Sequence, residues 1–452
     1  MEGRYDHGLL KVGTCCLHQL HNAFRDATHS NEWGVGKFLT ALYYLFNKVP
    51  ARREEYETLT SRSEMPKKFC AHRWAENVEP AKRAIVMLPH LRTWIKELEK
   101  KKNSKDFKIP KCASFDTVKS FVSQKFAMPQ LHFYVTMTKP IESFLTIYQT
   151  DAPMMPFLVK DLDTLLKELV SWVIKKSVAD FNDDKILNID FEKESNLKKK
   201  KIHIGFAASS LLDSWTEQVE RPGRQPRAPI ATEEEVTAFK QECSRTVMVF
   251  LKKIKKKSPI SLSLARNLAC FDPCNISQKP SAAIAMFHKV LVVFEEKNLV
   301  AIGDCDLIEG QFFNFVHKFA KDSEDFKEFD QKKHRLDEIW FKNLNKKQFS
   351  QLWGVVSQAL VMSHGQASVE RGFSTNKYCI EDNQTDDSLI SRRIVKDHLH
   401  HIGGINFFVI TEKLIKYCLD SRMRYRTHIA SEKEKKTNEV KKERGLTLTS
   451  NH

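Results

Sequence analysis

The chain has 452 residues, of which 41% are hydrophobic and 29% charged, a balance that excludes wholesale disorder and, at roughly 150 residues per domain, allows about three domains. It contains only 15 glycines and 15 prolines, too few for the many turns of a barrel or a sandwich, so long helices are favoured. The formal net charge of +16 makes a polyanion the first partner to consider.

Membrane insertion and secretion are not expected. No apolar run approaches the roughly 18–20 residues of a membrane span, because the most apolar stretch, 281–294, contains His288 and Lys289. The N-terminal sequence has neither the apolar segment nor the cleavage signal of a secreted protein. The 10 cysteines follow no disulfide framework, so we expect a reducing compartment, the nucleus or alternatively the cytosol.

The predicted elements begin with a short strand-like segment at 9–15 and a helix that continues through His21 and Phe24. Apolar residues at helical spacing predict further helices, over 34–46, 66–98, 128–148 and 157–178. Internal loops are expected at 188–204, which is rich in lysine, and at 221–229, which is rich in proline, glycine and arginine.

The C-terminal half is also predicted to be helical. Thr232-Glu233-Glu234-Glu235 has the form of a capping box, which indicates that a long helix begins there. Three more helices are expected, over 366–380, over 388–399 and from about residue 405. The last runs into the charged segment 431–444, which is either a helix extended by ion pairs or partly disordered. We expect partial disorder.

One stretch near the C-terminus has the form of a known family signature. Residues 363–377 place small residues before Glu-Arg, one variable residue and Phe-Ser. This order resembles the C-terminal signature of the hAT superfamily of DNA transposases. Other stretches resemble one divergent animal branch of that superfamily, namely 13–18, 21–24, 50–54, 69–74, 144–145, 149–154, 335–337 and 352–353. Together they cover nearly the whole chain.

The resemblance implies a mainly α protein in which a partial ribonuclease-H-like α/β core is interrupted by a large all-helical insertion domain. The implied domains are a remnant of the core over 1–80, the insertion over 81–345, a C-terminal dimerisation region with the core's last helices over 346–425, and a charged, flexible tail over 426–452. The resemblance also implies a nuclear location and a homodimer or larger oligomer.

The family cleaves DNA with Mg²⁺ held by two Asp and one Glu, and that glutamate falls on Glu370. The family aspartates lie upstream of a Cys-x-x-His pair that falls on Cys15 and His18, before which only Glu2 and Asp6 occur. The chain therefore looks like the back half of a transposase, without the family's zinc finger. A single carboxylate cannot hold two divalent cations about 4 Å apart. We expect Glu370 to be an inherited, idle position and expect no metal or other cofactor, with Mg²⁺ bound only if the missing acids are supplied.

Two pairs of residues near the N-terminus have alternative interpretations. The resemblance implies that Cys15 and His18 pack and form hydrogen bonds at the end of a buried strand. The alternative, a structural zinc site with nearby Cys and His residues, is not favoured, because their spacing is not that of a standard zinc finger. Arg73 and Trp74 match the family's Arg-Trp pair, which lies near the DNA hairpin formed at a cleaved end. An indole stacks on an unpaired base for about 1–3 kcal/mol, and a guanidinium can clamp the phosphate. The alternative is a core tryptophan beside an exposed arginine.

Two basic runs suit a DNA backbone, Lys198, Lys199, Lys200 and Lys201 in a predicted loop and Lys252, Lys253, Lys255, Lys256 and Lys257 near a predicted helix end. Such contacts release counterions, so binding would depend on salt and not on sequence. The alternatives are a solvated loop and a helix end at which lysines favour the macrodipole. Arg371, next to Glu370, is a further candidate DNA contact.

Apolar residues line one side of two predicted C-terminal helices. Val369 and Phe373 do so on the first, and Phe408, Ile415 and Leu419 on the last. Each face is either intramolecular core or a dimer interface, and the resemblance favours the interface.

We therefore expect a basic, dimerising, domesticated transposase-like protein, derived from a transposable element, that binds DNA mostly through its backbone and does not cleave it. One alternative is a protein–protein scaffold that binds no nucleic acid. The other is part of an intact transposase.

Overall fold

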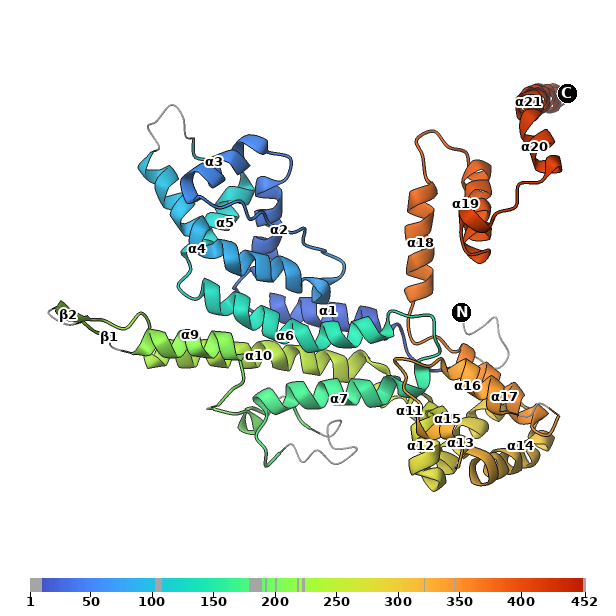
Figure 1. Cartoon of the computed structure of the whole chain (residues 1–452), viewed down its shortest axis with the longest axis horizontal. Helices are drawn as coiled ribbons and strands as arrows, with labels where there is room; N and C mark the ends of the chain where they lie inside the picture. Colours follow the sequence, from blue (N-terminus) through green and yellow to red (C-terminus); the bar gives the residue numbers. More distant parts are fainter. Residues whose placement is uncertain are drawn as a thin grey trace. The chain divides into compact units, whose positions relative to one another are not determined.

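The computed structural model describes residues 10–101, 108–178, 189–191, 193–199, 201–217, 219–221, 224–320, 322–344 and 347–449 (Figure 1). These residues form helices and one two-stranded sheet, which confirms the mainly α class. The ribonuclease-H-like core, which needs a larger sheet, stays a prediction. The chain divides into two compact units, Met1–Ser368 (unit 1) and Val369–His452 (unit 2). The domain boundaries drawn from the resemblance stay predictions as well.

The first elements of unit 1 are α1 (Cys16–His29), α2 (Val35–Phe46), α3 (Pro50–Thr60), η2 (Trp74–Glu76) and α4 (Val78–Lys100). The helices predicted around His21 and over 34–46 are confirmed as α1 and α2. The strand predicted at 9–15 is wrong for its described residues, which form no regular element. Gly13 explains the difference, since its φ of +94° lies outside the extended region, and a Cβ at this position would lie 3.1 Å from the Cβ of Pro259.

The helix predicted over 66–98 begins only at Val78, because the side chain of Asn77 closes the preceding loop. Its amide nitrogen lies 3.1 Å from the carbonyl oxygens of Cys70, Arg73 and Trp74. Its oxygen accepts a hydrogen bond from the backbone N–H of Cys70 at 2.7 Å. A side chain that satisfies local backbone groups in this way competes with the helix, so α4 starts after it.

The middle of unit 1 contains α5 (Ala113–Ser123), α6 (Ala127–Tyr148), α7 (Met155–Val173), η3 (Glu194–Asn196), α9 (Phe206–Thr216), β1 (Val219–Arg221), β2 (Arg224–Arg227) and α10 (Glu233–Lys257). The predicted helix over 128–148 is confirmed as α6, whereas α7 ends before residue 178 because Ile174 instead forms an antiparallel bridge with Leu197. An antiparallel hairpin, β1–β2, occupies the place of the loop predicted at 221–229. A Pro-Gly pair between two short extended segments favours such a turn.

The capping box predicted at the start of α10 is confirmed. The Thr232 hydroxyl accepts a hydrogen bond from the backbone N–H of Glu235 at 3.2 Å. The Glu235 carboxylate accepts one from the backbone N–H of Thr232 at 2.9 Å. Two donors that the first turn would leave unpaired are thereby satisfied, which fixes where this long helix begins.

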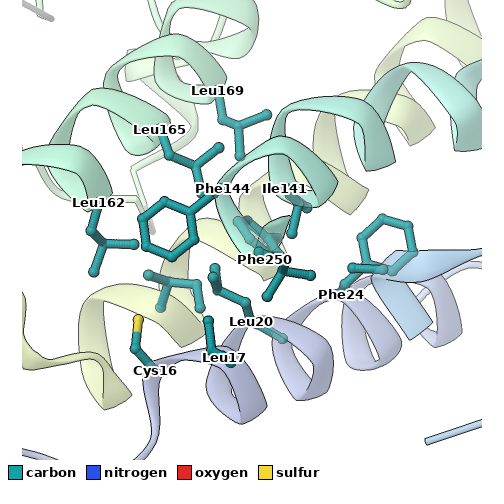
Figure 2. Close-up of a cluster of buried hydrophobic side chains, with 14 of the residues drawn as sticks. Cys16, Leu17, Leu20, Phe24, Ile141, Phe144, Leu162, Leu165, Leu169 and Phe250 are labelled. Atoms are coloured by element: carbon teal, nitrogen blue, oxygen red, sulfur yellow. The ribbon is translucent and has the colours of Figure 1, made fainter. Parts of the chain in front are cut away.

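Four helices, α1, α6, α7 and α10, meet in the core that supports the candidate site (Figure 2). The labelled side chains are all buried and come from each of the four helices: Cys16, Leu17, Leu20, Phe24, Ile141, Phe144, Leu162, Leu165, Leu169 and Phe250. Burying one side chain of this size stabilises the fold by about 1.5–3 kcal/mol. This core therefore fixes α1 and α6, which carry several of the candidate residues.

The rest of unit 1 is a set of shorter helices: η4 (Pro259–Ser261), α11 (Ser263–Asn267), η5 (Leu268–Phe271), α12 (Pro273–Gln278), α13 (Pro280–Glu296), α14 (Ile302–Phe315), the π-helical η6 (Val316–Ala320), α15 (Glu324–Lys327), α16 (Leu336–Asn343) and α17 (Ser350–Val361). Trp340 lies at their centre, fully buried, and donates a hydrogen bond from Nε1 to the Phe271 carbonyl at 3.0 Å. The rings of Phe315 and Phe326 lie 5.2 and 5.4 Å from its ring.

The C-terminal elements are α18 (Ala367–Cys379), α19 (Asp386–His401), η7 (Ile405–Phe407), α20 (Glu412–Leu419) and α21 (Ser421–Thr449). The helices predicted over 366–380 and 388–399 are confirmed as α18 and α19. The helix predicted from residue 405 is wrong in its first part, because Gly403 and Gly404 adopt φ values of +89° and +115°. Only the short 3-10 helix η7 forms before Thr411, and residues 408–411 belong to no regular element. The backbone of 431–444 lies within α21, so the helical alternative replaces the partial disorder that we expected.

Candidate functional site

Glu76 is the centre of a polar cluster that joins α1, η2 and the end of α6. His21 accepts a hydrogen bond at Nδ1 from the backbone N–H of Ala75 at 3.3 Å, and its Nε2 lies 3.5 Å from a carboxylate oxygen of Glu76. The amide of Gln149 donates to the same oxygen at 2.7 Å, and Arg73 donates to the other at 3.3 Å. His21, Arg73, Glu76 and Gln149 are named the Glu76 cluster below.

The electrostatics of the Glu76 cluster indicate an anchor. Burial raises the pKa of Glu76, but the hydrogen bond from His21 and the positive charge of Arg73 outweigh burial, so its pKa lies below the ordinary value. The carboxylate is therefore ionised at neutral pH and has no proton to give. The Glu76 carboxylate therefore has a structural role, because its contacts hold η2 against α1 and against the end of α6.

The start of the signature stretch is anchored on the same end of α6. His364 is buried and donates a hydrogen bond from Nε2 to the carbonyl of Tyr148 at 2.9 Å. The adjacent Gly365 lies so near α1 that a Cβ on it would be 3.3 Å from Leu17. The stretches 13–18, 144–154 and 363–365 thus meet in unit 1, an arrangement that the sequence patterns did not predict.

The free energy of unfolding is expected to fall as the pH is lowered from about 7 to about 5. Burial lowers the pKa of His364, although its bond to Tyr148 opposes this, and burial also lowers the pKa of His132. Below the unfolded value of about 6.5 the unfolded chain then binds more protons than the folded chain, so acid favours unfolding. Urea unfolding followed by circular dichroism across this pH range measures the loss. His364→Gln should reduce the pH dependence, and an unchanged slope in that variant would contradict the assignment.

Trp74 is a core residue in this structure. Its side chain is 9% exposed, and the rings of His29 and Phe69 pack edge-on against it at 4.7 and 5.0 Å. A Cβ on Gly36 of α2 would lie 2.4 Å from the indole, so the ring is seated directly on that glycine. No face of the indole is open to a DNA base in this conformation. Of the two interpretations of Arg73 and Trp74, the observed packing matches a core tryptophan.

Cys15 and His18 lie at the start of α1, so the prediction that they occupy the end of a buried strand is wrong. His18 is exposed and Cys15 half-buried, whereas the adjacent Cys16 is fully buried. Burial, followed by the neighbouring Cys15, raises the pKa of the Cys16 thiol to about 12. The buried thiol is therefore neutral and acts as a small apolar side chain.

The lysine run at 198–201 faces solvent only in part. Lys198 donates from Nζ to the Ser171 carbonyl at 2.5 Å, and burial together with the charge of Lys176 lowers its pKa. Lys199 and Lys201 are exposed, and Lys200 lies outside the described residues. Two cations of this run are thus available to an anion.

The lysine run near the end of α10 is also partly engaged by the protein. Lys253 forms an ion pair with Asp26 of α1, and Lys255 donates to the Ile189 carbonyl at 3.0 Å. Lys252 is half-buried, while Lys256 and Lys257 are exposed in the last turn. Favourable interaction with the helix dipole accounts for lysines at such a position even without DNA.

Glu370 and Arg371 lie on α18. Arg371 is exposed, and the side chain of Glu370 lies outside the described part of the structure. Nearby acids of unit 2 are held by arginines, Glu381 by Arg392 at 2.5 Å and Asp397 by Arg393 at 2.8 Å. In the described ranges no three His, Cys, Asp or Glu side chains are grouped so that they could hold a metal ion.

The residues predicted to form a dimer interface lie on an open surface of unit 2. Val369, Phe373, Ile415 and Leu419 are exposed, and Phe408 is half-buried. Where burial is described in unit 2, Cys379 alone is buried. Further large apolar side chains are exposed there: Tyr378, Ile380, Ile390, Ile394, Val395, Ile405, Phe407, Val409, Ile410, Tyr417, Met423, Tyr425 and Ile429.

Sequence reasoning missed a basic surface along α4. One cavity, of about 410 Å³, lies between Lys82 of α4, Lys139 of α6 and Phe206 of α9. A second, of about 550 Å³, lies between α4 and α5 and extends to Trp215 of α9. The two cavities and the face of α4 that lines both are named the α4 groove. Basic residues at helical spacing on α4 were the available signal, but the partners across the groove come from other helices.

No helix of the described ranges is both long enough and apolar enough to cross a membrane. Comparison with protein-family models, with curated proteins and with solved structures finds no match.

Proposed function

We propose that this chain is a hAT-transposase-like protein that associates with itself through unit 2 and binds DNA without cleaving it. The signature at 363–377, the apolar surface of unit 2 and the net charge of +16 support the proposal. Under it, the helices of unit 1 belong to a large helical insertion beside a partial ribonuclease-H-like core. The protein then acts in the nucleus, where its DNA partner is found.

The observation that carries the proposal is the exposed apolar surface of unit 2. Monomeric soluble proteins rarely leave more than a few hundred Å² of contiguous apolar surface open to water. A buried aromatic side chain covers about 150–250 Å², and unit 2 exposes several, namely Phe373, Tyr378, Phe407, Tyr417 and Tyr425. A standard interface buries about 800 Å² per partner, an area that about five such side chains supply when they pack against one partner.

A second copy of the chain is the partner that this surface fits. The same apolar faces are present on every copy, so a two-fold arrangement covers both sets at once. Where burial is described, the helices of unit 2 bury almost nothing among themselves. Most of the stability of a helix in a protein comes from the packing of its apolar face. Association therefore supplies the packing that these helices do not find within their own unit.

The test is the mass of the purified chain in solution. We expect a dimer at micromolar concentration and a monomer for Phe373→Glu combined with Leu419→Glu, since both side chains are exposed and a buried charge at an interface is costly. Light scattering coupled to size-exclusion chromatography measures the mass. The matched control, Lys377→Glu with Lys413→Glu, changes exposed charged residues of the same helices and should stay dimeric.

A monomeric wild-type chain would overturn self-association, because the apolar faces would then be covered within one molecule. A double glutamate variant that stays dimeric would move the interface elsewhere. Unchanged circular dichroism in both variants separates loss of association from loss of fold.

DNA binding is tested by its salt dependence. The exposed side chains of Lys199, Lys201, Lys256 and Lys257 can each contact a phosphate. The logarithm of the binding constant for a dye-labelled duplex should therefore fall linearly with the logarithm of the salt concentration, with a slope of about −0.9 per phosphate contact. No binding at low salt would favour a scaffold that has no nucleic-acid partner. Plasmid DNA incubated with the chain and Mg²⁺ should stay supercoiled, and nicking abolished by Glu370→Gln would overturn the non-catalytic assignment.

A further inference from the structure

The α4 groove follows one face of a single long helix. Lys82, Ile85, Arg92 and Lys96 are spaced by three, four or seven residues, which places them on one stripe of α4. At 1.5 Å per residue, the distance from Lys82 to Lys96 along the helix is about 21 Å. The stripe lines the cavity of about 410 Å³ near its start and the cavity of about 550 Å³ near its end. The two cavities thus lie at separate points along one helix, an arrangement that suits a chain-like ligand better than a compact one.

Aromatic side chains of α9 lie at both cavities. Phe206 is 87% exposed, the largest exposure among the large apolar residues of the described structure, and it borders the first cavity. Trp215 borders the second, with one side of its ring against Phe126 at 5.7 Å. Both rings therefore have surface available to a flat ligand.

The position of Phe206 is fixed by the backbone before it. Gly205 has a φ of +88°, and a Cβ there would overlap the hydroxyl of Thr136 on α6. The first turn of α9 is consequently held close to α6. An exposed phenyl ring on a fixed backbone gives up little freedom when it binds, which favours a role in recognition over an accident of exposure.

Cations outnumber acids along the groove. Lys96 and Lys139 form no ion pair within the described residues. Arg92 donates to the carbonyls of Val122 and Gln124 at 3.1 and 3.3 Å, which uses two of the five donors of its guanidinium. The remaining lining lysines are paired with exposed acids: Lys82 with Glu79, Lys119 with Glu99 and Lys125 with Glu235. Exposed pairs of this kind are worth about 0–1 kcal/mol each, so phosphate can replace the carboxylate.

We propose that the α4 groove binds an unpaired nucleic-acid strand, with phosphates on the lysines and arginine and with bases on Phe206 and Trp215. Aromatic rings set among cations in a groove are the arrangement that holds single strands, because every base has a face that can stack. In a duplex the bases are already stacked inside, so an exposed phenyl ring has nothing to bind. The inference rests on the proposed binding of nucleic acid and names the strand state and the surface.

The test compares strands and variants in one assay. Anisotropy of dye-labelled oligo(dT), oligo(U) and a duplex of equal length is measured with the full chain, with Phe206→Ala and with Lys96→Ala combined with Lys139→Ala. Loss of one stacked base should weaken single-strand binding by about 5- to 150-fold in Phe206→Ala, with duplex affinity unchanged. The lysine variant should weaken single-strand binding and reduce the salt slope by about 0.7 per phosphate lost.

Phe313→Ala is the matched control, since Phe313 is a half-exposed phenylalanine on α14, which contributes no residue to either cavity. Binding of the full chain without any effect of Phe206→Ala would overturn the groove and leave the proposed function standing. Failure of the full chain to bind any strand or duplex would overturn both. Displacement of oligo(dT) by poly-glutamate at equal charge concentration would show that an acidic peptide is the occupant and overturn the inference. A stronger response to oligo(dT) than to oligo(U) would identify DNA as the source of the strand, and the reverse would identify RNA.

Discussion

Trp74→Ala is expected to lower the free energy of unfolding by about 3–5 kcal/mol, the range for a buried tryptophan cut to alanine. The side chain is 9% exposed and fills the space between His29, Phe69 and Gly36. Removing it leaves a cavity that these neighbours cannot fill without moving. Urea unfolding followed by circular dichroism gives the value. A loss below about 1 kcal/mol would show that the ring contributes little packing and would restore the base-stacking interpretation.

The same contact can be tested from its other side. Gly36→Ala should destabilise the fold by about 1–3 kcal/mol, since the new Cβ would lie 2.4 Å from the indole and force it to move. Gly354→Ala is the matched control in α17, because a Cβ there meets no atom within 4 Å. Alanine is the better helix former, so this variant should gain up to about 1 kcal/mol. Equal effects of the two variants would contradict the packing of Trp74 on Gly36.

Trp340→Ala is expected to cost about 3–5 kcal/mol through a cavity in the second aromatic core of unit 1. Trp340 is fully buried among the rings of Phe271, Phe315 and Phe326. Trp340→Phe keeps much of the packing but leaves the Phe271 carbonyl without its donor, so it should cost about 1–3 kcal/mol.

The adjacent residue supplies the control for Trp340. Phe341 lies on the same helix, α16, and is 55% exposed, with its ring edge-on to that of Trp353 at 5.8 Å. Phe341→Ala should therefore lower the free energy of unfolding by only about 0.5–1.5 kcal/mol. All three variants are measured by urea unfolding under one set of conditions. A cost for Phe341→Ala that equals the cost for Trp340→Ala would contradict the burial pattern of α16.

Local sequence patterns predicted most helices because helix formation depends on neighbouring residues. The capping box at Thr232 and Glu235 is enough to place the start of α10, and the periodic apolar residues of α6 and α18 are enough to place those two helices. The predicted helix boundaries were wrong where a side chain forms hydrogen bonds with the local backbone, or where a glycine with a positive φ turns the chain. Asn77 delays the start of α4, and Gly403 and Gly404 interrupt the last predicted helix.

Side-chain roles were harder to predict because they depend on contacts between distant segments. The burial of Trp74 requires Gly36 of α2 and His29 of α1, which no pattern around residue 74 reveals. The engagement of Lys253 requires Asp26. The α4 groove requires residues from α4, α5, α6 and α9, so its cations look in the sequence like ordinary surface residues.

The division at Ser368 has a spectroscopic consequence. All 7 tryptophans of the chain belong to unit 1, at positions 33, 74, 94, 172, 215, 340 and 353. Unit 2 contains no tryptophan, so apart from the weakly fluorescent phenylalanines its only fluorescent side chains are tyrosines. Indole emission therefore reports on unit 1 alone. On dilution, copies joined through unit 2 would separate with no change in that signal, while the tyrosine signal excited at shorter wavelength would respond. The choice of excitation wavelength thus distinguishes dissociation from unfolding in a single sample.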